Sequence, residues 1–227
     1  MELSANRYWM LRHGTSLANE AGVIVSSLAN GVLPAFGLAP LGREQAAAAG
    51  RELRTQLADL GAAPGRLLVL ASPFSRTQQT AALAVAAACD GDGDGGALPP
   101  VRTDERLRER SFGADLELQS HDAYAQVWAR DAEDPTCAPP GGGESVADVA
   151  ARARALLSEC EAAHSYLDVL LVGHGDLLSI LAATACGSDA RRHREHGLQP
   201  AELRRLAGRP TAGRPADGRP TAAGGRE

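Results

Sequence analysis

The sequence YWMLRHGTS, residues 8–16, changes from apolar to polar within a few positions. Its first four residues are typical of a buried strand, whereas Arg12 and His13 are polar and Gly14 follows at once. In open sheets with parallel strands, ligands bind beyond the carboxyl ends of the strands. We therefore predict that Arg12 and His13 point into such a crevice and that Gly14 lets the chain turn away.

Two further apolar runs end in polar side chains of the same kind. Residues 67–71 lead into SPFSRTQQTA, which places Arg76 in the first turn of the following helix. Residues 168–173 lead into His174, and the apolar helix 177–185 follows. The strand ends together supply two histidines and two arginines. Guanidinium groups and helix N-termini both favour anions, so this set suits a phosphate dianion.

Helix-length segments alternate with these strands, over residues 41–60, 77–88 and 145–164. In the first we expect Leu41, Leu53, Leu57 and Leu60 to be the apolar side chains on an alanine-rich background that favours helix. In the last, Ser145 with Asp148 three residues later is typical of a helix start. Alternation of this kind predicts an α/β protein, a three-layer α/β/α sandwich with a mostly parallel central sheet.

Composition limits the classes of partner. The chain has 227 residues, of which 44% are hydrophobic and 22% charged, as expected for one globular domain. A net charge of −5 gives no sign of a nucleic-acid or membrane partner. The four cysteines are widely spaced, which indicates neither a disulfide framework nor a metal site. With no secretory or membrane-spanning pattern in the sequence, we expect a cytoplasmic protein.

Each polar feature also has an ordinary explanation when it is taken alone. A lone histidine at a strand end is commonly a surface or core residue, and Arg76 alone is compatible with a solvated helix position. The joint pattern favours function, because Arg-His-Gly follows one strand, His-Gly follows another, and Ser-x-x-x-Arg lies between them in the sequence.

The same residues resemble the histidine phosphatase, or phosphoglycerate-mutase-like, superfamily. Its signature is Arg-His-Gly with an asparagine six residues after the histidine, here Arg12, His13, Gly14 and Asn19. Other segments fall in family order, namely LAPLGREQA (38–46), SPFSRTQQTA (72–81), LRERSFG (107–113), GGESVADVAAR (142–152) and VGHGD (172–176). HREHGLQPAELRRL resembles the family's closing strand region, so the resemblance covers about residues 7–206. It implies phosphoryl transfer to the first histidine without a metal ion or other cofactor.

The resemblance also implies roles for individual residues. His13 would be the nucleophile, kept neutral by the two flanking arginines and held in one tautomer by a hydrogen bond from its other ring nitrogen to a carbonyl. Arg12, Arg76 and His174 would hold the phosphate oxygens. Substrate contacts are also expected from Asn19 and Gly175.

A general acid is also needed, because the leaving oxygen must be protonated. Glu109 is the candidate, since LRERSFG resembles the family segment in which a glutamate precedes an aromatic-glycine pair. Glu105 in the same charged stretch is the competing candidate.

Departures from the family pattern bear on the reaction. Mutases of the family carry a basic segment that grips the substrate, whereas here Arg130 is the only basic residue between Arg110 and Arg152. We therefore predict hydrolysis of a small phosphate ester. Phosphoglycerate-mutase-type transfer and a non-catalytic phosphate-binding module remain the alternatives. The catalytic domain is expected over residues 1–206, with 114–143 as a cap that sets specificity, while the oligomeric state is left open.

Three other segments are given ordinary interpretations. DGDGDGG, residues 90–96, has the aspartate spacing of a calcium loop, but Val101 occupies the position of the required glutamate, so we predict an acidic linker. Residues 207–227 repeat Gly-Arg-Pro and are expected to be disordered. The run RRHR, residues 191–194, is interpreted as solvated rather than as part of the pocket rim.

Overall fold

Short apolar segments form the centre of the molecule, a five-stranded sheet in the order β3-β2-β4-β1-β5. The computed structural model describes residues 3–62, 67–90, 98–165 and 167–206. The strands are β1 (Arg7–Arg12), β2 (Leu67–Ala71), β3 (Val101–Thr103), β4 (Asp168–Gly173) and β5 (Leu203–Arg205). Every pairing is parallel except that of β5 with β1. The mostly parallel sheet is therefore confirmed.

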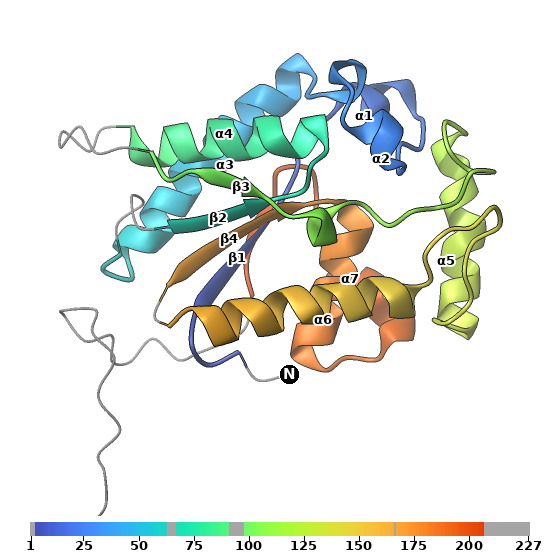
Figure 1. The fold of residues 1–227 in the computed structure, drawn as a ribbon. Helices are drawn as coiled ribbons and strands as arrows, with labels where there is room; N and C mark the ends of the chain where they lie inside the picture. The colour runs from blue at the N-terminus through green and yellow to red at the C-terminus, as the bar shows by residue number, and fades with distance from the viewer. Residues whose placement is uncertain (1–2, 63–66, 91–97, 166, 207–227) are drawn as a thin grey trace, which may run out of the picture.

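Alternation of side chains along the strands divides the core into two layers. Trp9 and Leu11 of β1 pack on one face with helices α3 (Pro40–Ala58) and α4 (Ser75–Cys89). Tyr8 and Met10 pack on the other face with α6 (Val146–Ala163) and α7 (Gly175–Cys186). Side chains of a strand alternate between faces, so one strand serves both cores. Figure 1 shows the sheet between the two pairs of helices, as predicted for a three-layer sandwich.

Shorter elements gather at the end of the sheet toward which the parallel strands point (Figure 1). They are α1 (Leu17–Ala21), α2 (Leu28–Gly31), η1 (Pro34–Phe36), η3 (Glu105–Leu107), η4 (His121–Ala123), α5 (Tyr124–Glu133) and η5 (Ala190–His196). The segment predicted as a cap therefore contains a helix, α5, and lies beside the strand ends rather than on a face of the sheet.

Helix boundaries follow local chemistry. At α6 the Ser145 side chain accepts from the Asp148 backbone N–H while the Asp148 side chain accepts from the Ser145 backbone, which confirms the predicted start. The first long helix begins at Pro40 because proline suits the first helical position, and it ends at Ala58, two residues before the predicted end.

Two details of the sequence prediction are wrong or incomplete. Leu41 is 53% exposed, whereas Leu53 and Leu57 are buried. Twelve residues separate Leu41 from Leu53, which places them about a third of a turn apart on the helix. Strand β3 was not predicted, because three residues at a sheet edge carry too short a pattern.

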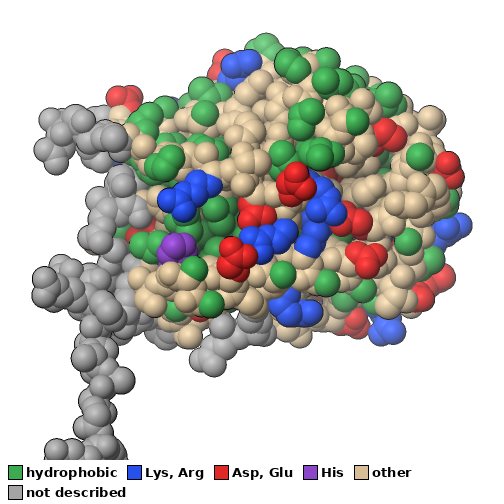
Figure 2. All heavy atoms as spheres, in the orientation of Figure 1, with side chains coloured by type: hydrophobic (Ala, Val, Ile, Leu, Met, Phe, Trp, Pro, Cys, Tyr) green, Lys and Arg blue, Asp and Glu red, His purple; other side chains and the backbone are tan. Residues whose placement is uncertain are grey.

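On the face drawn in Figure 2, positive and negative side chains lie interspersed. Arg106 pairs with Asp104 at 2.7 Å, and Arg108 pairs with Glu144 at 2.6 Å. Among the described residues, no helix is both long and apolar enough to cross a membrane. The predicted linker and tail lie outside the described residues, except for Asp90.

The loop after β1 packs backbone to backbone against the start of α3. The Thr15 carbonyl accepts from the Ala39 backbone N–H at 3.0 Å, and the Thr15 N–H donates to the Gln45 side chain at 2.9 Å. A Cβ on Gly42 would overlap the Thr15 carbonyl oxygen, and one on Gly14 would overlap the Gly42 carbonyl oxygen. Only glycine allows this approach.

We expect Gly42→Ala to destabilise the protein by about 1–3 kcal/mol, because the loop or the helix must move to relieve the overlap. Alanine's better helix propensity, about 1 kcal/mol, offsets only part of this cost. Chemical denaturation measures the difference. Ala48→Ser, which adds one atom at an exposed position of the same helix, should change the free energy of unfolding by less than about 0.5 kcal/mol. Equal stability of Gly42→Ala and the wild type would contradict the packing described.

Candidate active site

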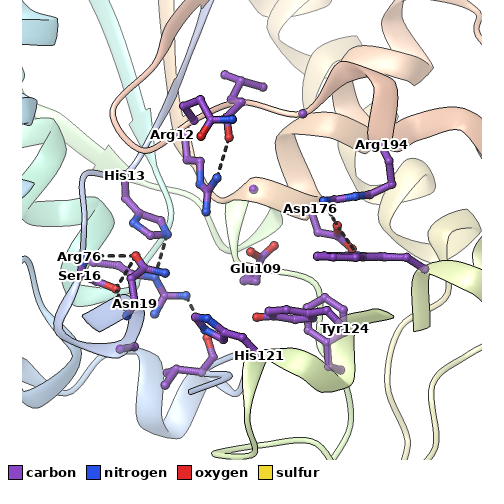
Figure 3. Close-up of a pocket in the computed structure, with 18 of the residues that line it drawn as sticks. Arg12, His13, Ser16, Asn19, Arg76, Glu109, His121, Tyr124, Asp176 and Arg194 are labelled. Carbon is purple, nitrogen blue, oxygen red and sulfur yellow. Dashed lines mark hydrogen bonds and ion pairs between the residues drawn. The ribbon is translucent and has the colours of Figure 1, made fainter. Parts of the chain in front are cut away.

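A cavity of about 520 Å³ lies at the carboxyl ends of β1 and β4. Figure 3 shows Arg12, His13 and Arg76 on one side of it and Asp176 with Arg194 on the other. The lining side chains come from segments far apart in the sequence, which are the loop after β1, the first turn of α4, residues 109–128, the start of α7 and residues 194–199. This is the crevice that the strand-end pattern predicted.

His13 stands immediately after β1 with its ring buried and one ring nitrogen acting as a hydrogen-bond acceptor. Its backbone N–H donates to the Gly173 carbonyl at 3.0 Å, which continues the pairing of β1 with β4 by one residue. Its Nδ1 lies 2.8 Å from the Gly14 carbonyl oxygen. Because a carbonyl only accepts, Nδ1 carries the proton and Nε2 keeps its lone pair. The predicted tautomer lock is thus supplied by Gly14.

The Arg76 guanidinium lies between two imidazoles. Its Nε is 3.2 Å from His13 Nε2 and 3.3 Å from His174 Nδ1. Its Nη2 donates to the Val25 carbonyl at 2.9 Å. The other nitrogen of His174, Nε2, lies 2.8 Å from the Ser72 hydroxyl. His174 is fully buried beside His13, with ring centroids 5.2 Å apart, and it contacts Arg76 rather than lining the cavity itself.

Burial and the two cations keep both imidazoles neutral. Desolvation, followed by the charges of Arg76 and Arg12, lowers the pKa of His13 well below its ordinary value. Desolvation and Arg76 lower the pKa of His174 in the same way. Burial also lowers the pKa of Arg76 to about 10, so this side chain still carries its charge at neutral pH. A neutral imidazole, which keeps a lone pair on one ring nitrogen, is the form able to attack.

Arg12 supplies a second cation to the cavity. Its Nη1 donates to the Leu198 carbonyl at 2.6 Å. A Cβ on Gly175 would lie 3.3 Å from the Arg12 guanidinium carbon, so the glycine leaves room for the arginine. Arg12 Nε and Arg76 Nη1 are both buried with no hydrogen-bond partner among the described residues. Unpaired buried donors are rare, and two from guanidiniums in one cavity form a cradle for an anion.

Glu109 is the carboxyl group of the cavity. Its Oε1 accepts from the backbone N–H of Arg110 at 2.9 Å and of Leu177, in the first turn of α7, at 3.2 Å. Burial and then the nearby Asp176 raise the pKa of Glu109, which favours the protonated acid. Glu105, the competing candidate, is exposed on η3 and does not line the cavity. The geometry therefore separates the two glutamates.

Asn19 and Gly175 also line the cavity. Asn19 is held by the capping box of α1, where its side-chain oxygen accepts from the Ser16 backbone N–H at 3.0 Å and from the Ser16 hydroxyl at 2.9 Å. Gly175 begins α7, so its backbone stands at a helix N-terminus. All seven predicted site residues thus meet at one place: six line the cavity, and His174 lies buried behind it.

The opposite wall is a stack of flat groups. Tyr124 stacks on Trp128 with ring centroids 5.0 Å apart and planes 14° apart, and on His121 at 5.4 Å and 30°. The Arg194 guanidinium covers Trp128, with its carbon 3.5 Å from the ring centroid. Asp176 accepts from Trp128 Nε1 at 3.1 Å and from Arg194 at 3.4 Å. The stack therefore joins η4, α5 and η5 to the first turn of α7.

A buried ion cluster supports this wall from behind. Arg110 is fully buried and donates to both carboxylate oxygens of Asp131 at 2.6 and 2.8 Å. It also donates to Asp176 at 3.2 Å and to the Glu144 carbonyl at 2.7 Å. Because Arg110 is the residue after Glu109, the cluster fixes the glutamate relative to α5 and α7.

The model of the histidine phosphatase superfamily (branch 1) matches residues 8–215. The chain belongs to this superfamily. Glucosyl-3-phosphoglycerate phosphatase of Mycobacterium tuberculosis (strain H37Rv) is 37% identical over 196 residues, 80% of this chain and 75% of that protein. The probable phosphoglycerate mutase GpmB of Proteus mirabilis is 31% identical over 156 residues, 66% of this chain and 67% of that protein. These two relatives are thus named as a phosphatase and as a probable phosphoglycerate mutase.

Solved structures agree on the fold. A mycobacterial glucosyl-3-phosphoglycerate phosphatase in complex with VO3 has a TM-score of 0.69 and 30% identity, covering 89% of this chain and 91% of that one. The alpha-ribazole phosphatase of Shigella flexneri has a TM-score of 0.62 and 27% identity, covering 87% and 88% of the two chains. The fold class and the superfamily predicted from the sequence are confirmed.

For this histidine phosphatase, sequence reasoning missed the second wall of the cavity. Tyr124 and Trp128 lie four residues apart, a spacing typical of any helix face, so the pattern carried no functional signal. The interpretation of residues 191–194 as solvated is wrong for His193, and the exposed Arg194 follows the rejected alternative, the pocket rim. His193 is fully buried against the Ser179 hydroxyl at 3.1 Å, and Arg194 lines the cavity because Trp128 offers it a flat surface.

The depressed pKa of His13 predicts acid sensitivity. The unfolded chain protonates this histidine below about pH 6.5, whereas the folded chain resists protonation. The free energy of unfolding therefore decreases as the pH falls from about 6.5, the pKa of the unfolded chain, toward the lower pKa of His13 in the folded protein. Below about pH 6, the wild type should lose about 1.4 kcal/mol per pH unit more than His13→Asn does. Urea unfolding at a series of pH values measures this difference.

Above about pH 7.5 the stability difference between the two proteins should be constant, which provides the internal control. Curves that stay parallel down to pH 4.5 would show that His13 titrates normally in the folded protein.

Proposed function

We propose that the protein is a phosphomonoesterase that hydrolyses a small phosphorylated metabolite through a phosphohistidine on His13, without a metal ion. One observation carries the proposal. His13 lines the cavity together with Arg12 and Arg76, whose buried nitrogens Arg12 Nε and Arg76 Nη1 have no hydrogen-bond partner among the described residues. Relatives named as phosphatases, one of them solved in complex with inorganic phosphate, support it.

In the first step, His13 Nε2 attacks phosphorus as the bond to the ester oxygen breaks. Arg12 and Arg76 offset the charge of the three equatorial oxygens, the main requirement of phosphoryl transfer. In the free protein the lone pair of His13 Nε2 accepts a hydrogen bond from Arg76 Nε. When this lone pair attacks phosphorus, that hydrogen bond is lost, and Arg76 can donate to the phosphate instead. The Nδ1 proton held by Gly14 stabilises the ring as it becomes positively charged.

His174 supports this step from behind, where it accepts from Arg76 Nε. Its direct contact with a phosphate oxygen, expected from the family resemblance, stays a prediction. Asn19 and the Gly175 backbone line the same side of the cavity and are the further substrate contacts of the proposal.

Glu109 completes both steps by moving one proton. As a neutral acid it protonates the departing alkoxide, which leaves as an alcohol. The resulting carboxylate then accepts a proton from water as the water oxygen attacks the phosphohistidine, releasing inorganic phosphate and restoring His13 and the acid. The raised pKa suits this double role, because it favours the protonated carboxyl group that the leaving oxygen needs.

The wall of the cavity opposite His13 carries few cations, which favours hydrolysis over mutase chemistry. Arg130, the only basic residue between Arg110 and Arg152, is exposed and does not line the main cavity. Arg194 does line it, but stacks on Trp128 and pairs with Asp176. A mutase must hold a second acceptor while the phosphohistidine persists, and this wall offers little charge for that task. A non-catalytic binding module is disfavoured because nucleophile, acid and cations are all present.

His13→Ala should lower turnover of p-nitrophenyl phosphate by more than about 10³-fold, because the nucleophile is lost. Phosphate release is measured in the presence of EDTA, with circular dichroism to verify folding. The wild type should retain its activity with the chelator. Turnover that survives the substitution, or that disappears with EDTA, would exclude the proposed mechanism.

The same assay separates hydrolase from mutase. With 3-phosphoglycerate as the only substrate, the proposed phosphatase releases inorganic phosphate, whereas a mutase forms the 2-phospho isomer. Isomer without phosphate would favour the mutase.

Glu109→Gln should lower kcat/KM on an alkyl phosphate by about 10²–10⁴-fold. The loss in kcat/KM on p-nitrophenyl phosphate should be much smaller, because kcat/KM reports phosphoryl transfer to His13 and nitrophenolate departs without a proton. In the wild type, alkyl phosphate hydrolysis should decline as the pH rises through the raised pKa of Glu109, and the variant should lack that limb. Glu105→Gln is the matched control and should leave both rates unchanged. Equal losses of Glu109→Gln on both substrates would argue against an acid role.

A further inference from the structure

The aromatic wall of the cavity has no ring face to offer a ligand at Tyr124 or Trp128. Tyr124 is covered by Trp128 on one face and by His121 on the other. Trp128 lies between Tyr124 and the Arg194 guanidinium. Phe112 meets Tyr124 edge to face at 4.8 Å and is itself buried. A flat leaving group such as a nucleobase or an aryl ring therefore finds edges here, not a surface to stack on.

What this wall does present is the hydroxyl of Tyr124. Figure 3 shows the phenol directed into the cavity, with its oxygen between Glu109 and His121. The described residues supply no hydrogen bond to that oxygen. Contacts on both ring faces fix its direction, and Asp176 anchors Trp128 behind it through the indole N–H. A phenol held in this way is a preorganised donor without a partner of its own.

Electrostatics keep the Tyr124 proton in place. Burial, then the charges of Glu109 and Asp176, raise the pKa of this phenol above its ordinary value, while Arg76 and Arg12 act in the opposite direction. Figure 3 shows the phenol oxygen near Glu109. It stands beside the proposed acid and on the substrate side of the arginine cradle.

We propose that Tyr124 is a specificity-determining residue that donates a hydrogen bond to a hydroxyl of the leaving alcohol, and that the substrates are aliphatic polyol phosphates. This inference rests on the proposed function. The rest of that wall agrees with it, since the side chains that line the cavity away from His13 are mainly hydrogen-bonding ones: His121, Asp176, Arg194, Glu195 and Gln199. A site built to bond a hydroxyl discriminates against the analogue that lacks it, because its own polar group is left unpaired.

Two substrates with the same carbon chain test the proposal. Glycerol 3-phosphate carries two free hydroxyls, and n-propyl phosphate carries none. The wild type should prefer glycerol 3-phosphate in kcat/KM. Tyr124→Phe, which keeps the ring stack, should lower kcat/KM on glycerol 3-phosphate by about tenfold, the effect of one hydrogen bond, and on n-propyl phosphate by less than about twofold. Competitive inhibition by inorganic phosphate should be unchanged, because the phenol contacts the alcohol and not the phosphoryl group.

Tyr8→Phe is the matched control, since it removes a buried tyrosine hydroxyl that bonds Glu161 far from the cavity. It should leave the preference between the two substrates unchanged. Equal losses of Tyr124→Phe on both substrates would reveal a merely structural role, and a raised inhibition constant for phosphate would place the hydroxyl on the phosphoryl group. Either result overturns the inference.

The wild type alone gives a second test that does not depend on a variant folding. No preference for glycerol 3-phosphate over n-propyl phosphate would overturn the polyol assignment, even while His13-dependent turnover of p-nitrophenyl phosphate upheld the proposed function. Absence of His13-dependent turnover on every ester would instead remove the proposed function itself.

Discussion

The register between β1 and β4 is the constraint on which the site depends. The two strands pair in parallel with Arg12 opposite Gly173, so the next residues, His13 and His174, leave the sheet at the same level. Strand β2 pairs with the other edge of β4 and brings Ser72 to His174. A slip of one residue would reverse the side-chain directions of a whole strand and expose its buried set. The hydrophobic core therefore fixes the distance between the imidazoles.

Burial then gives these side chains their chemistry. Two histidines at the same level in water would each titrate near pH 6.5, but desolvation and Arg76 hold both neutral here. Burial lowers the pKa of both arginines, but the nearby Glu109 raises it, and one donor of each bonds a carbonyl oxygen, of Val25 or of Leu198. Among the described residues, two buried guanidinium nitrogens, one on each of these arginines, have no hydrogen-bond partner. This is a costly arrangement in the free protein, and an anion that satisfies those donors removes the cost.

The sequence was sufficient for the part of the site that the sheet builds. His13, Arg76 and His174 directly follow buried strands or begin the next helix, and a parallel sheet brings such positions together whatever their separation in the chain. Glu109 was found by resemblance, and it became distinct from Glu105 only when the fold buried one and exposed the other. The aromatic wall was not predictable, because its contacts cross from α5 to η5 and depend on tertiary packing. Arg194 shows this well, since no local pattern places a guanidinium over Trp128.

The two halves of the cavity are therefore held in place by different parts of the fold. The half that holds His13 is tied to the central strands, so a change there disturbs the core as well as the chemistry. The half that holds Tyr124 rests on a compact set of side chains around Arg110, Asp131 and Asp176, whose charges bond one another at the end of the sheet. Removing one member would leave a buried charge without its partner, which costs more than the pair contributes. Substitutions at the surface of the stack leave that cluster intact, so the shape of the leaving-group side can change while the phosphate cradle stays fixed. On the proposed function, the residues that would contact the alcohol lie on segments other than β1, which positions the nucleophile, and Glu109 beside Arg110 links the two halves.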